Sequence, residues 1–496
     1  MTNIQRRTFL KGVLGAAALA PFLGWNAASA DPASVSQSEN PQRILILGAG
    51  MSGLTAALSL MRRGHSVRIL EFQDRVGGRL WSLPLEGGQY TEAGGGHFRG
   101  NMPYVLSYIR RFNLPLLTLN DGLPRYFFGG KSADGAVLSN WPFNLNQRER
   151  NVTVSSMLNT YLVESGFDTD SVLDADWPSQ ELIERFDHLT LGGLLGNAGC
   201  SEDFLRVLEA HGGEFVPEAA LLGILPDLAY HFGDENLFRI QGGNQKLPEA
   251  MADEIGSQNI VLDAPVVSID QSGNTVKVRV KDGRTFEGDR VISTIPFSVI
   301  DDVEMTPRWS EPKSRMFREF EWSNTVKVVC QTAKPTWLSK GVHGWPMAGS
   351  DRPWERVIDI TGNEPGGYGN LFFYLNDENA VRYLAQPKNT RARDLVSMFQ
   401  ADLPGLIEDV VTLKDVAWSE QPWIKASFGG PPVNGSWMIE EWTKPEGRIH
   451  FAGDFTTMKT GWVEGAIESG LRAARQIDAE APSETGRTVR QELKRP

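Results

Sequence analysis

The sequence is poor in the residues that build metal centres and disulfide frameworks. Only two cysteines, Cys200 and Cys330, and seven histidines occur among 496 residues. No group of cysteine and histidine residues has the spacing of a metal site, so we expect no metal. Two cysteines allow at most one disulfide, and we favour two buried free thiols over that pair.

A membrane-spanning run and an excess of basic charge are also missing. The most apolar stretch, residues 12–24, is about 13 residues long, and a bilayer span needs about 20. The chain carries a formal net charge of −12, which becomes −15 without its first thirty residues, because these hold three basic residues and no acid. An acidic body excludes nucleic acid and anionic membrane as expected partners.

The N-terminus has the pattern of an export signal. A twin-arginine motif, Gln5-Arg6-Arg7-Thr8-Phe9-Leu10-Lys11, precedes the apolar stretch, and Ala28-Ser29-Ala30 offers a small-residue cleavage site. We therefore predict a twin-arginine signal peptide over residues 1–30, cleaved after Ala30, and a periplasmic mature protein. An uncleaved membrane anchor is the alternative. Residues 31–41 are polar and predict a linker.

A dinucleotide-binding unit follows the linker. An apolar run over residues 43–47 predicts a buried strand, residues 54–63 a helix, and residues 66–71 a second strand. Between the first strand and the helix stands a glycine-rich turn, Gly48-Ala49-Gly50-Met51-Ser52-Gly53. Glu71 lies at the end of the second strand, where an acid accepts the ribose hydroxyls and disfavours a 2′-phosphate. We expect Gly48, Gly50, Ser52, Gly53 and Glu71 to bind this cofactor.

The same unit is completed near the C-terminus. Residues 447–454 and 461–470 close the site that residues 48–53 open about 400 residues earlier. A substrate domain must therefore interrupt the nucleotide domain. The chain is also too long to fold around a single hydrophobic core. We predict an α/β (α+β) fold with a Rossmann-like FAD-binding domain (42–101, 236–300 and 443–478). Helices plus an antiparallel sheet form the substrate-binding domain (102–235 and 301–442), and residues 479–496 form a flexible tail.

Five segments, in order, carry a family resemblance. They are Glu71-Phe72-Gln73-Asp74-Arg75-Val76-Gly77-Gly78-Arg79, Thr91-Glu92-Ala93-Gly94-Gly95-Gly96, Gln241-Gly242-Gly243-Asn244-Gln245-Lys246-Leu247-Pro248, Thr294-Ile295-Pro296 and Ala452-Gly453-Asp454. With them the chain resembles the flavin amine oxidase superfamily, which includes monoamine oxidases and L-amino acid oxidases. The resemblance implies FAD as the cofactor, and no metal.

The resemblance also assigns cofactor contacts. Gly78, Gly95, Gly96 and His97 would lie against FAD, and Arg79 would pair with phosphate charge. The alternative for Arg79 is a solvated or locally salt-bridged side chain. Further along the chain, the backbone of Val267 would face the adenine, Asp454 would take a hydroxyl near the pyrophosphate, and Val463 would lie along the isoalloxazine. Ser427 occupies the position of the cysteine that bonds to flavin in monoamine oxidases, so non-covalent binding is expected.

Three residues are implied for the reaction, the oxidation of an amine C–N bond to an imine. Lys327 matches a lysine linked through water to flavin N5, although a strand lysine that points to solvent is the ordinary alternative. Phe428 and Trp462 match the two walls of an aromatic cage that receives the amine. Each could instead be a core aromatic.

The substrate class depends on His97, which we also count among the catalytic candidates. L-Amino acid oxidases carry an arginine there for the substrate carboxylate, and losing that cation costs on the order of 3 kcal/mol. His97 could instead bond flavin or substrate, or be structural, and Arg99 could compensate only if the loop were rebuilt. An acid at Asp359 would repel a carboxylate too, although a solvated or capped aspartate is the more ordinary interpretation of this residue. We favour a primary or secondary amine without α-carboxylate, and keep an L-amino acid as the alternative.

Other reactions and partners stay open. Desaturases and porphyrinogen oxidases of the same superfamily act on carbon–carbon bonds, and a redox-silent flavin-binding protein is a further alternative. The pairing of Phe428 and Trp462 with Lys327 argues against both. Electrons would pass to O2, giving hydrogen peroxide, or to a periplasmic carrier such as a cytochrome. The sequence leaves a homodimer open.

Overall fold

The computed structural model describes most of the chain. The described residues are 36–119, 125–128, 131–134, 143–212, 217–232, 236–340, 347–348, 352–361 and 366–479. The predicted signal peptide, the first half of the predicted linker and nearly all of the predicted tail lie outside them. Among the described residues, no helix combines the length and apolar character that a membrane span requires.

A five-stranded parallel sheet forms the centre of the nucleotide-binding part. Its strands, in spatial order, are β10 (Ile260–Val261), β2 (Ser66–Leu70), β1 (Arg43–Leu47), β14 (Arg290–Ser293) and β23 (Ile449–Phe451). Ile46 on β1 pairs with Ile69 on one side and Ile292 on the other. Residues 44–47 of β1, 291–293 of β14 and all of β23 are buried, as in strands covered on both faces, whereas Ser66 and Arg68 of β2 are exposed.

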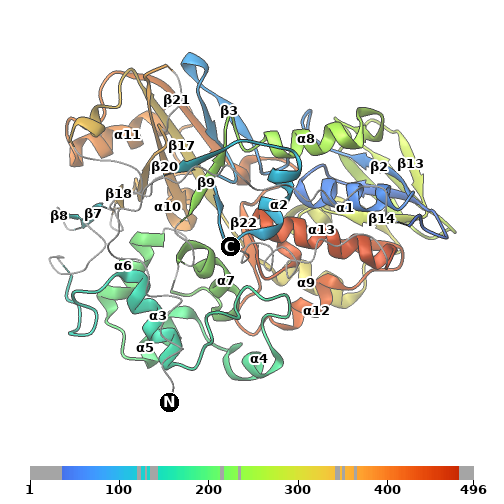
Figure 1. The fold of residues 1–496 in the computed structure, drawn as a ribbon, viewed down its shortest axis with the longest axis horizontal. Helices are drawn as coiled ribbons and strands as arrows, with labels where there is room; N and C mark the ends of the chain where they lie inside the picture. Colours follow the sequence, from blue (N-terminus) through green and yellow to red (C-terminus); the bar gives the residue numbers. More distant parts are fainter. Residues whose placement is uncertain are drawn as a thin grey trace, which may run out of the picture.

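Helices from distant parts of the chain cover this sheet. They are α1 (Met51–Arg62), α2 (Pro103–Arg111), α8 (Lys246–Ile255) and α13 (Val463–Ile477). Figure 1 shows α1, in blue, beside α13, in red. A Cβ on Gly470 of α13 would meet the Ser52 carbonyl oxygen of α1 at 2.3 Å, so glycine permits this close approach. Helix α1 begins three residues before the predicted start because Gly50 serves as its N-cap.

Antiparallel sheets make up much of the remainder. A four-stranded sheet contains β13 (Thr285–Gly288), β12 (Val276–Val280), β11 (Val266–Asp270) and β15 (Glu304–Thr306), the last parallel to β11. A seven-stranded sheet contains β21 (Val410–Ala417), β17 (Thr325–Thr332), β20 (Gly369–Asn376), β19 (Arg356–Asp359), β18 (Met347–Ala348), β7 (Arg125–Phe128) and β8 (Lys131–Asp134). Smaller sheets pair β3 (Ser82–Pro84) with β4 (Tyr90–Glu92), β16 (Glu321–Ser323) with β22 (Phe428–Gly430), and β9 (Leu237–Ile240) with β5 (Phe98–Arg99) and β6 (Leu116–Leu119).

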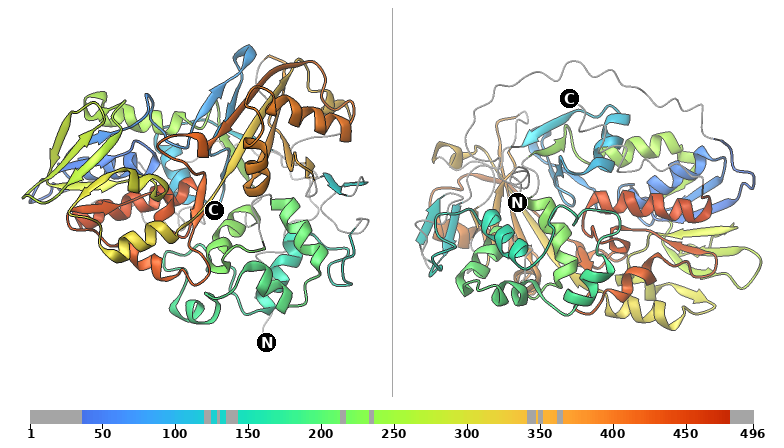
Figure 2. Two further views of the ribbon diagram at one scale, coloured as in Figure 1. Left: turned by 180° about the vertical axis from the view of Figure 1, so that it is seen from behind. Right: turned by 60° about the horizontal axis from the view of Figure 1, so that its bottom comes forward.

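The remaining helices form two groups in the substrate-binding part and one pair near β23. The first group is α3 (Val154–Glu164), α4 (Gln180–Phe186), α5 (Leu191–Asn197), α6 (Glu202–Gly212) and α7 (Leu221–Phe232). The second is α10 (Asp377–Leu384) and α11 (Arg391–Asp402), which pack on the seven-stranded sheet, and the pair is α9 (Glu311–Glu319) and α12 (Trp437–Thr443). The left view of Figure 2 shows the first group, in teal and green, below the seven-stranded sheet, in orange. The predicted α/β fold class is confirmed.

The two cysteines do not form a disulfide. Cys330 is buried in β17, Cys200 is partly buried, and both thiols are free. Burial raises the pKa of each thiol to about 12, so both are inert thiols at neutral pH. Within the described part of the chain, no cluster of three or more histidine, cysteine, aspartate or glutamate side chains could hold a metal ion.

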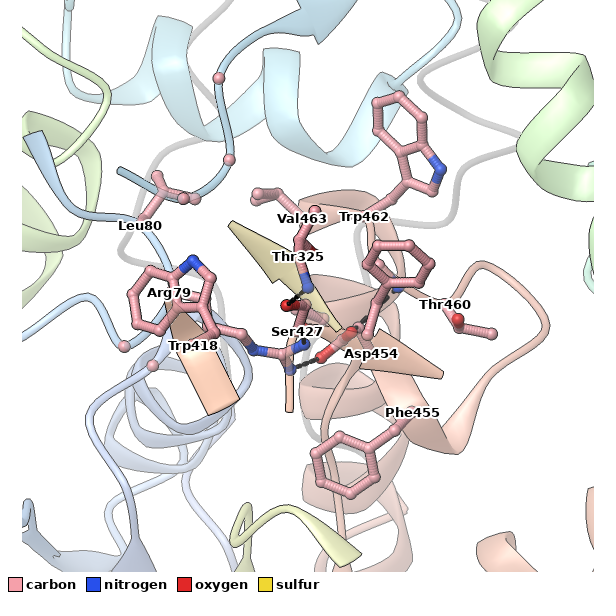
Figure 3. A pocket seen from close by; sticks show the side chains of 18 of the residues that line it. Arg79, Leu80, Thr325, Trp418, Ser427, Asp454, Phe455, Thr460, Trp462 and Val463 are labelled. Atoms are coloured by element: carbon pink, nitrogen blue, oxygen red, sulfur yellow. Dashed lines mark hydrogen bonds and ion pairs between the residues drawn. The ribbon is translucent and has the colours of Figure 1, made fainter. Parts of the chain in front are cut away.

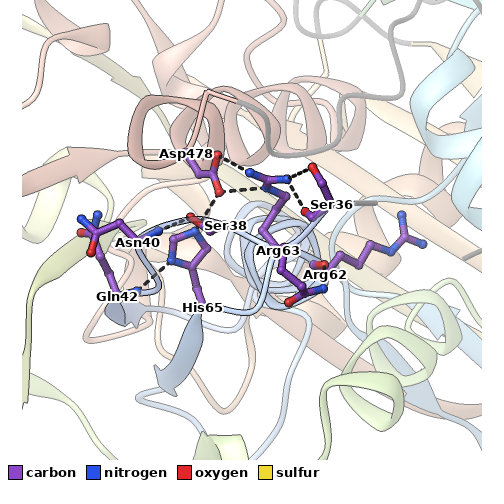
Figure 4. A network of polar contacts seen from close by, with 9 residues as sticks. Ser36, Ser38, Asn40, Gln42, Arg62, Arg63, His65 and Asp478 are labelled. Atoms are coloured by element: carbon purple, nitrogen blue, oxygen red, sulfur yellow. Dashed lines mark hydrogen bonds and ion pairs between the residues drawn. The ribbon is translucent and has the colours of Figure 1, made fainter. Parts of the chain in front are cut away.

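A buried polar network joins the two ends of the nucleotide-binding part (Figure 4). Arg63, after α1, pairs with Asp478, after α13, at 2.9 Å, and less than a tenth of either side chain is exposed. His65 Nε2 lies 3.1 Å from the same carboxylate, while its Nδ1 accepts from the Gln42 backbone N–H. Because Nδ1 accepts, the tautomer with hydrogen on Nε2 fits this geometry.

We expect Asp478→Ala to destabilise the protein by about 3–5 kcal/mol, since it leaves the Arg63 cation buried without its carboxylate. Urea unfolding of the variant against the wild type measures this change. Glu319→Ala is the matched control, because its ion pair with Arg315 is about half exposed on both sides and should contribute less than about 1 kcal/mol. Equal effects of the two variants would contradict a stabilising role for the network.

Candidate active site

A glycine-rich turn presents the beginning of α1 to a large cavity. Gly48 has a φ of 113°, and Gly50 caps α1 without any side-chain cap. The first turn of α1 contains no acid, so its backbone N–H groups and the positive end of the helix dipole favour an anion. A Cβ on Gly50 would meet no atom within 4 Å, which leaves open space at this turn. The cradle fits the pyrophosphate of a dinucleotide.

Glu71 stands beside this turn, as predicted from the sequence. It is buried, lines the cavity, and accepts from the Ala49 N–H at 2.6 Å and the Gln73 N–H at 3.0 Å. Burial raises its pKa to about 7, against the opposing effect of these two hydrogen bonds. Each carboxylate oxygen has a further lone pair, so Glu71 can still accept from a ribose hydroxyl.

Two of the predicted cofactor residues do not line the cavity. A Cβ on Gly53 would lie 2.1 Å from the Gly48 carbonyl oxygen, so this glycine allows helix and strand to pack closely. Val267 is likewise not among the described residues that line the cavity, whereas Ala264 and Val266 are. The chain therefore lines the cavity just before Val267, and the predicted contact of Val267 with the adenine stays a prediction.

Arg79 and Asp454 meet in the middle of the cavity (Figure 3). They form an ion pair, and Arg79 also donates to the Ser427 carbonyl oxygen. The second Asp454 oxygen accepts from the Gly461 N–H at 3.0 Å, which connects it to the segment leading into α13. Ser427 Oγ accepts from the Thr325 N–H at 2.8 Å, so this hydroxyl is held by β17. Phosphate recognition by Arg79 stays a prediction.

Lys327 points into the same cavity from β17. Its Nζ donates to the Gly94 carbonyl oxygen at 2.5 Å and lies 3.4 Å from the Glu92 carbonyl oxygen. The whole residue is only 8% exposed. The register places Lys327 opposite Tyr374 on β20, and Tyr374 opposite Arg356 on β19. The ordinary alternative, a lysine pointing to solvent, is therefore wrong.

A cation–aromatic–cation row results from this register. Lys327 Nζ lies 5.3 Å, and the Arg356 guanidinium 4.7 Å, from the centre of the Tyr374 ring. One row further along, Val329, Phe372 and Ile358 make the same face of the sheet apolar. Arg356 was not predicted from the sequence as a site residue, because only strand register shows which residues share a face with Lys327.

His97, Trp462 and Phe428 also line the cavity. The His97 and Trp462 rings meet edge to face, 5.6 Å apart. Burial, followed by the charge of Arg99, holds the pKa of His97 well below its usual range, so its imidazole is neutral at pH 7. A Cβ on Gly461, whose φ is 77°, would lie 3.3 Å from the Phe428 Cβ, so a glycine brings Phe428 against the Trp462 segment.

Further polar side chains on the cavity wall were not predicted. Asp227 and His231 come from α7, and Arg239 comes from β9. Arg99 is buried but is not among the described residues that line the cavity. Asp359 does line it, and its carboxylate accepts from the Thr361 N–H. Composition and spacing alone offered no signal for Asp227 or Arg239, because both lie in segments without a motif for this role.

The cavity is continuous from the glycine-rich turn to the aromatic wall. Its volume is about 890 Å³, near the upper end of the range of about 300–1,000 Å³ that small-molecule and cofactor sites occupy. It therefore joins a cradle for a dinucleotide to a chamber lined by Lys327 and aromatic rings. Such a combination is typical of redox enzymes that hold a dinucleotide cofactor beside their substrate.

Comparison with known proteins assigns the family. The family model described as flavin containing amine oxidoreductase matches residues 51–478, and the chain belongs to this family. The family implies an oxidoreductase with a flavin cofactor that acts on amines.

Two curated relatives cover most of the chain. The flavin-dependent L-tryptophan oxidase of Lentzea aerocolonigenes is 27% identical, over 89% of this chain and 99% of its own. The flavin-containing amine oxidase B of Canis lupus familiaris is 24% identical, over 88% and 85%.

Solved structures show the same fold. Putrescine oxidase bound to putrescine superposes with a TM-score of 0.76 at 21% identity, covering 89% of this chain and 99% of that one. The cyclohexylamine oxidase of Brevibacterium oxydans gives a TM-score of 0.71 at 21% identity, covering 92% and 100%. At this identity the likeness extends to the fold alone.

Proposed function

We propose that the protein oxidises the C–N bond of a small amine with non-covalently bound FAD. Bound FAD would take a hydride from the carbon that carries the nitrogen, and the resulting imine is hydrolysed to a carbonyl compound. One observation carries the proposal: the glycine-rich cradle, Lys327 and Trp462 all line a single continuous cavity.

The chain's own groups prepare the substrate. Trp462 and Phe428 bring aromatic rings to the cavity, where ring faces attract an amine and low polarity favours its neutral, oxidisable form. Lys327 is fixed by the Gly94 carbonyl oxygen, so a buried polar group stands at a defined place in the cavity that those rings also line. The sheet row beside it, formed by Val329, Phe372 and Ile358, is apolar, and Phe372 and Ile358 of this row line the cavity.

We propose a primary or secondary amine without α-carboxylate as the substrate. His97 stands where an amino acid oxidase would carry its carboxylate arginine, and a neutral imidazole cannot pair with an anion as a guanidinium does. Arg99 does not make up for this, because its side chain lies outside the described cavity wall.

An L-amino acid is the second candidate, and two cations favour it. Arg239 and Arg356 are each at least 95% buried and line the cavity. Arg239 is close enough to His97 and Glu92 to shift the pKa of both groups electrostatically. Either arginine could hold a carboxylate that approaches the chamber from the sheet side. The L-tryptophan oxidase among the relatives points the same way.

Paired substrates distinguish these classes. We expect phenethylamine, 3-methylbutylamine or pyrrolidine to give a kcat/KM at least about tenfold above that of L-phenylalanine, L-leucine or L-proline, respectively. Arg239→Met and Arg356→Met should each change kcat/KM for the amines by less than about threefold. Arg393→Met, at an exposed position of α11, is the matched control.

The opposite pattern would assign the enzyme to L-amino acids. In that case the three amino acids react faster, and one arginine variant loses about a hundredfold in kcat/KM for them alone. Turnover of no amine and no amino acid would instead favour the carbon–carbon desaturases of the superfamily or a redox-silent protein.

The attachment, the compartment and the electron acceptor are also proposals. A serine cannot form a thioether, so Ser427 supports non-covalent FAD, which acid precipitation should release into the supernatant. The twin-arginine pattern supports export to the periplasm, which sequencing of the mature N-terminus tests.

The electron acceptor is tested separately. The rate at which O2 reoxidises the reduced flavin, with hydrogen peroxide formed, is compared with the rate of reoxidation by a c-type cytochrome.

A further inference from the structure

Trp462 is fixed to the helical insertion by a single hydrogen bond. Its indole Nε1–H donates to Asp227 Oδ1 at 2.7 Å, across 235 positions of sequence. Trp462 is the residue that precedes α13, and Asp227 belongs to α7. Both line the cavity, so the bond joins two elements of its wall that are distant in sequence.

Aromatic rings confine the same indole on its other sides. Tyr230 packs against it at 5.0 Å and 47°, and His231 meets it edge to face at 5.3 Å and 72°. His97 adds a second edge-to-face contact. Ring contacts of this kind tolerate some rotation of the indole, whereas the hydrogen bond to Asp227 fixes its direction. The carboxylate therefore determines which part of Trp462 faces the chamber.

The Asp227 carboxylate lies beside another residue of α7. Asp227 Oδ2 is 3.2 Å from His231 Nδ1, one helical turn further on, and this ring nitrogen also lies 3.0 Å from the Asp227 backbone carbonyl oxygen. Pro226, the preceding residue, has no N–H and so cannot donate to the Leu222 carbonyl oxygen four residues back. Trp177 Nε1–H occupies that acceptor instead, at 3.3 Å. The hydrogen bond from Trp177 satisfies the carbonyl oxygen that the proline leaves unpaired, so α7 continues through Pro226. The next residue, Asp227, lines the cavity.

We propose that Asp227 is a positioning residue that orients Trp462, and through it the amine, in the chamber. The proposal rests on the proposed amine oxidation and assigns Asp227 no contact with the reacting atoms. Its hydrogen-bonding oxygen, rather than its charge, carries the role. Asparagine, which keeps a side-chain oxygen at the same place, should therefore replace it, whereas alanine should not.

Four variants test this role: Asp227→Asn, Asp227→Ala, Trp462→Phe and the double variant Asp227→Ala/Trp462→Phe. With the panel amine that reacts fastest, Asp227→Ala and Trp462→Phe should each raise KM about 10- to 100-fold. Asp227→Asn should stay within about threefold of the wild type. The double variant should be no worse than Trp462→Phe, because the hydrogen bond is already lost.

Two results would overturn the proposal. Equal losses in Asp227→Asn and Asp227→Ala would show that the charge matters, as in direct binding of a cationic amine. A further loss on adding Asp227→Ala to Trp462→Phe would show a role independent of the indole. If Asp227→Ala does not fold, the comparison of Asp227→Asn with the wild type and with Trp462→Phe still decides between oxygen and charge.

A spectroscopic readout separates this proposal from the proposed function. The indole ultraviolet difference spectrum should change in Asp227→Ala and remain unchanged in Asp227→Asn, whether or not any amine is oxidised. A wild type that no panel amine reduces would end the proposed function, while the spectrum would still report the bond between Asp227 and Trp462. An indole spectrum unaffected by Asp227→Ala would end the positioning proposal alone.

Discussion

Replacement of Lys327 by methionine is expected to slow anaerobic reduction of the bound flavin by about 10²- to 10⁴-fold, the range for losing a positioned group that holds or transfers a proton. Lys327 is a buried polar group of the proposed reaction chamber, anchored to the Gly94 carbonyl oxygen and 5.3 Å from the centre of the Tyr374 ring. Methionine keeps most of the volume of the side chain but removes every hydrogen-bond donor. Stopped-flow absorbance of the flavin measures the rate.

Lys277→Met is the matched control, because this lysine lies exposed on β12, away from the cavity. It should leave the rate unchanged. A Lys327→Met variant that binds flavin normally and is reduced at the wild-type rate would show that Lys327 is only a buried structural cation. A loss of flavin binding in this variant would instead place the lysine in cofactor retention.

Substitution of Gly94 by alanine is expected to yield protein without flavin, destabilised by at least about 3 kcal/mol. A Cβ at this position would lie 1.6 Å from the Arg79 carbonyl oxygen and 3.2 Å from the Trp418 ring. The first contact is with backbone, which cannot turn aside as a side chain does. The segment that carries Arg79 or the segment that carries Gly94 would have to shift. A shift of Gly94 would also move its carbonyl oxygen, which accepts the hydrogen bond from Lys327. Flavin absorbance per protein and urea unfolding measure the two effects.

Gly196→Ala provides the control for adding one methyl group. Gly196 lies in α5, and a Cβ there meets no atom within 4 Å. Alanine is the better helix former by about 1 kcal/mol, so this variant should be neutral or slightly more stable. Full flavin content and normal stability in Gly94→Ala would contradict the close packing of Gly94 against the Arg79 backbone.

Local patterns predicted the nucleotide half well. The apolar run before Gly48 and the alternation over residues 276–280 depend on residues close in sequence, and the structure has strands there as β1 and β12. The glycine motif and Glu71 follow two neighbouring strands of one βαβ unit, so the predicted strands bring them together. Predicted element ends were less accurate, as in α1, because the helix start depends on the backbone of Gly50 rather than on apolar spacing.

The substrate half depends on contacts that no local pattern contains. Asp227 meets Trp462 across 235 residues, and Arg356 shares a sheet face with Lys327 only through the register of β19, β20 and β17. A motif places Lys327 and Trp462, but it does not show what surrounds them. The sequence therefore predicts the substrate class less directly than it predicts the cofactor.

The most direct test of the account is anaerobic titration of the purified holoprotein with an amine, followed through the flavin absorbance. The panel amine that reacts fastest should bleach the flavin with a stoichiometry of one amine per flavin and release one equivalent of carbonyl product. Admission of an electron acceptor should restore the oxidised spectrum. A flavin that remains oxidised with every amine and every amino acid, yet is bleached by dithionite, would contradict amine oxidation by this cavity.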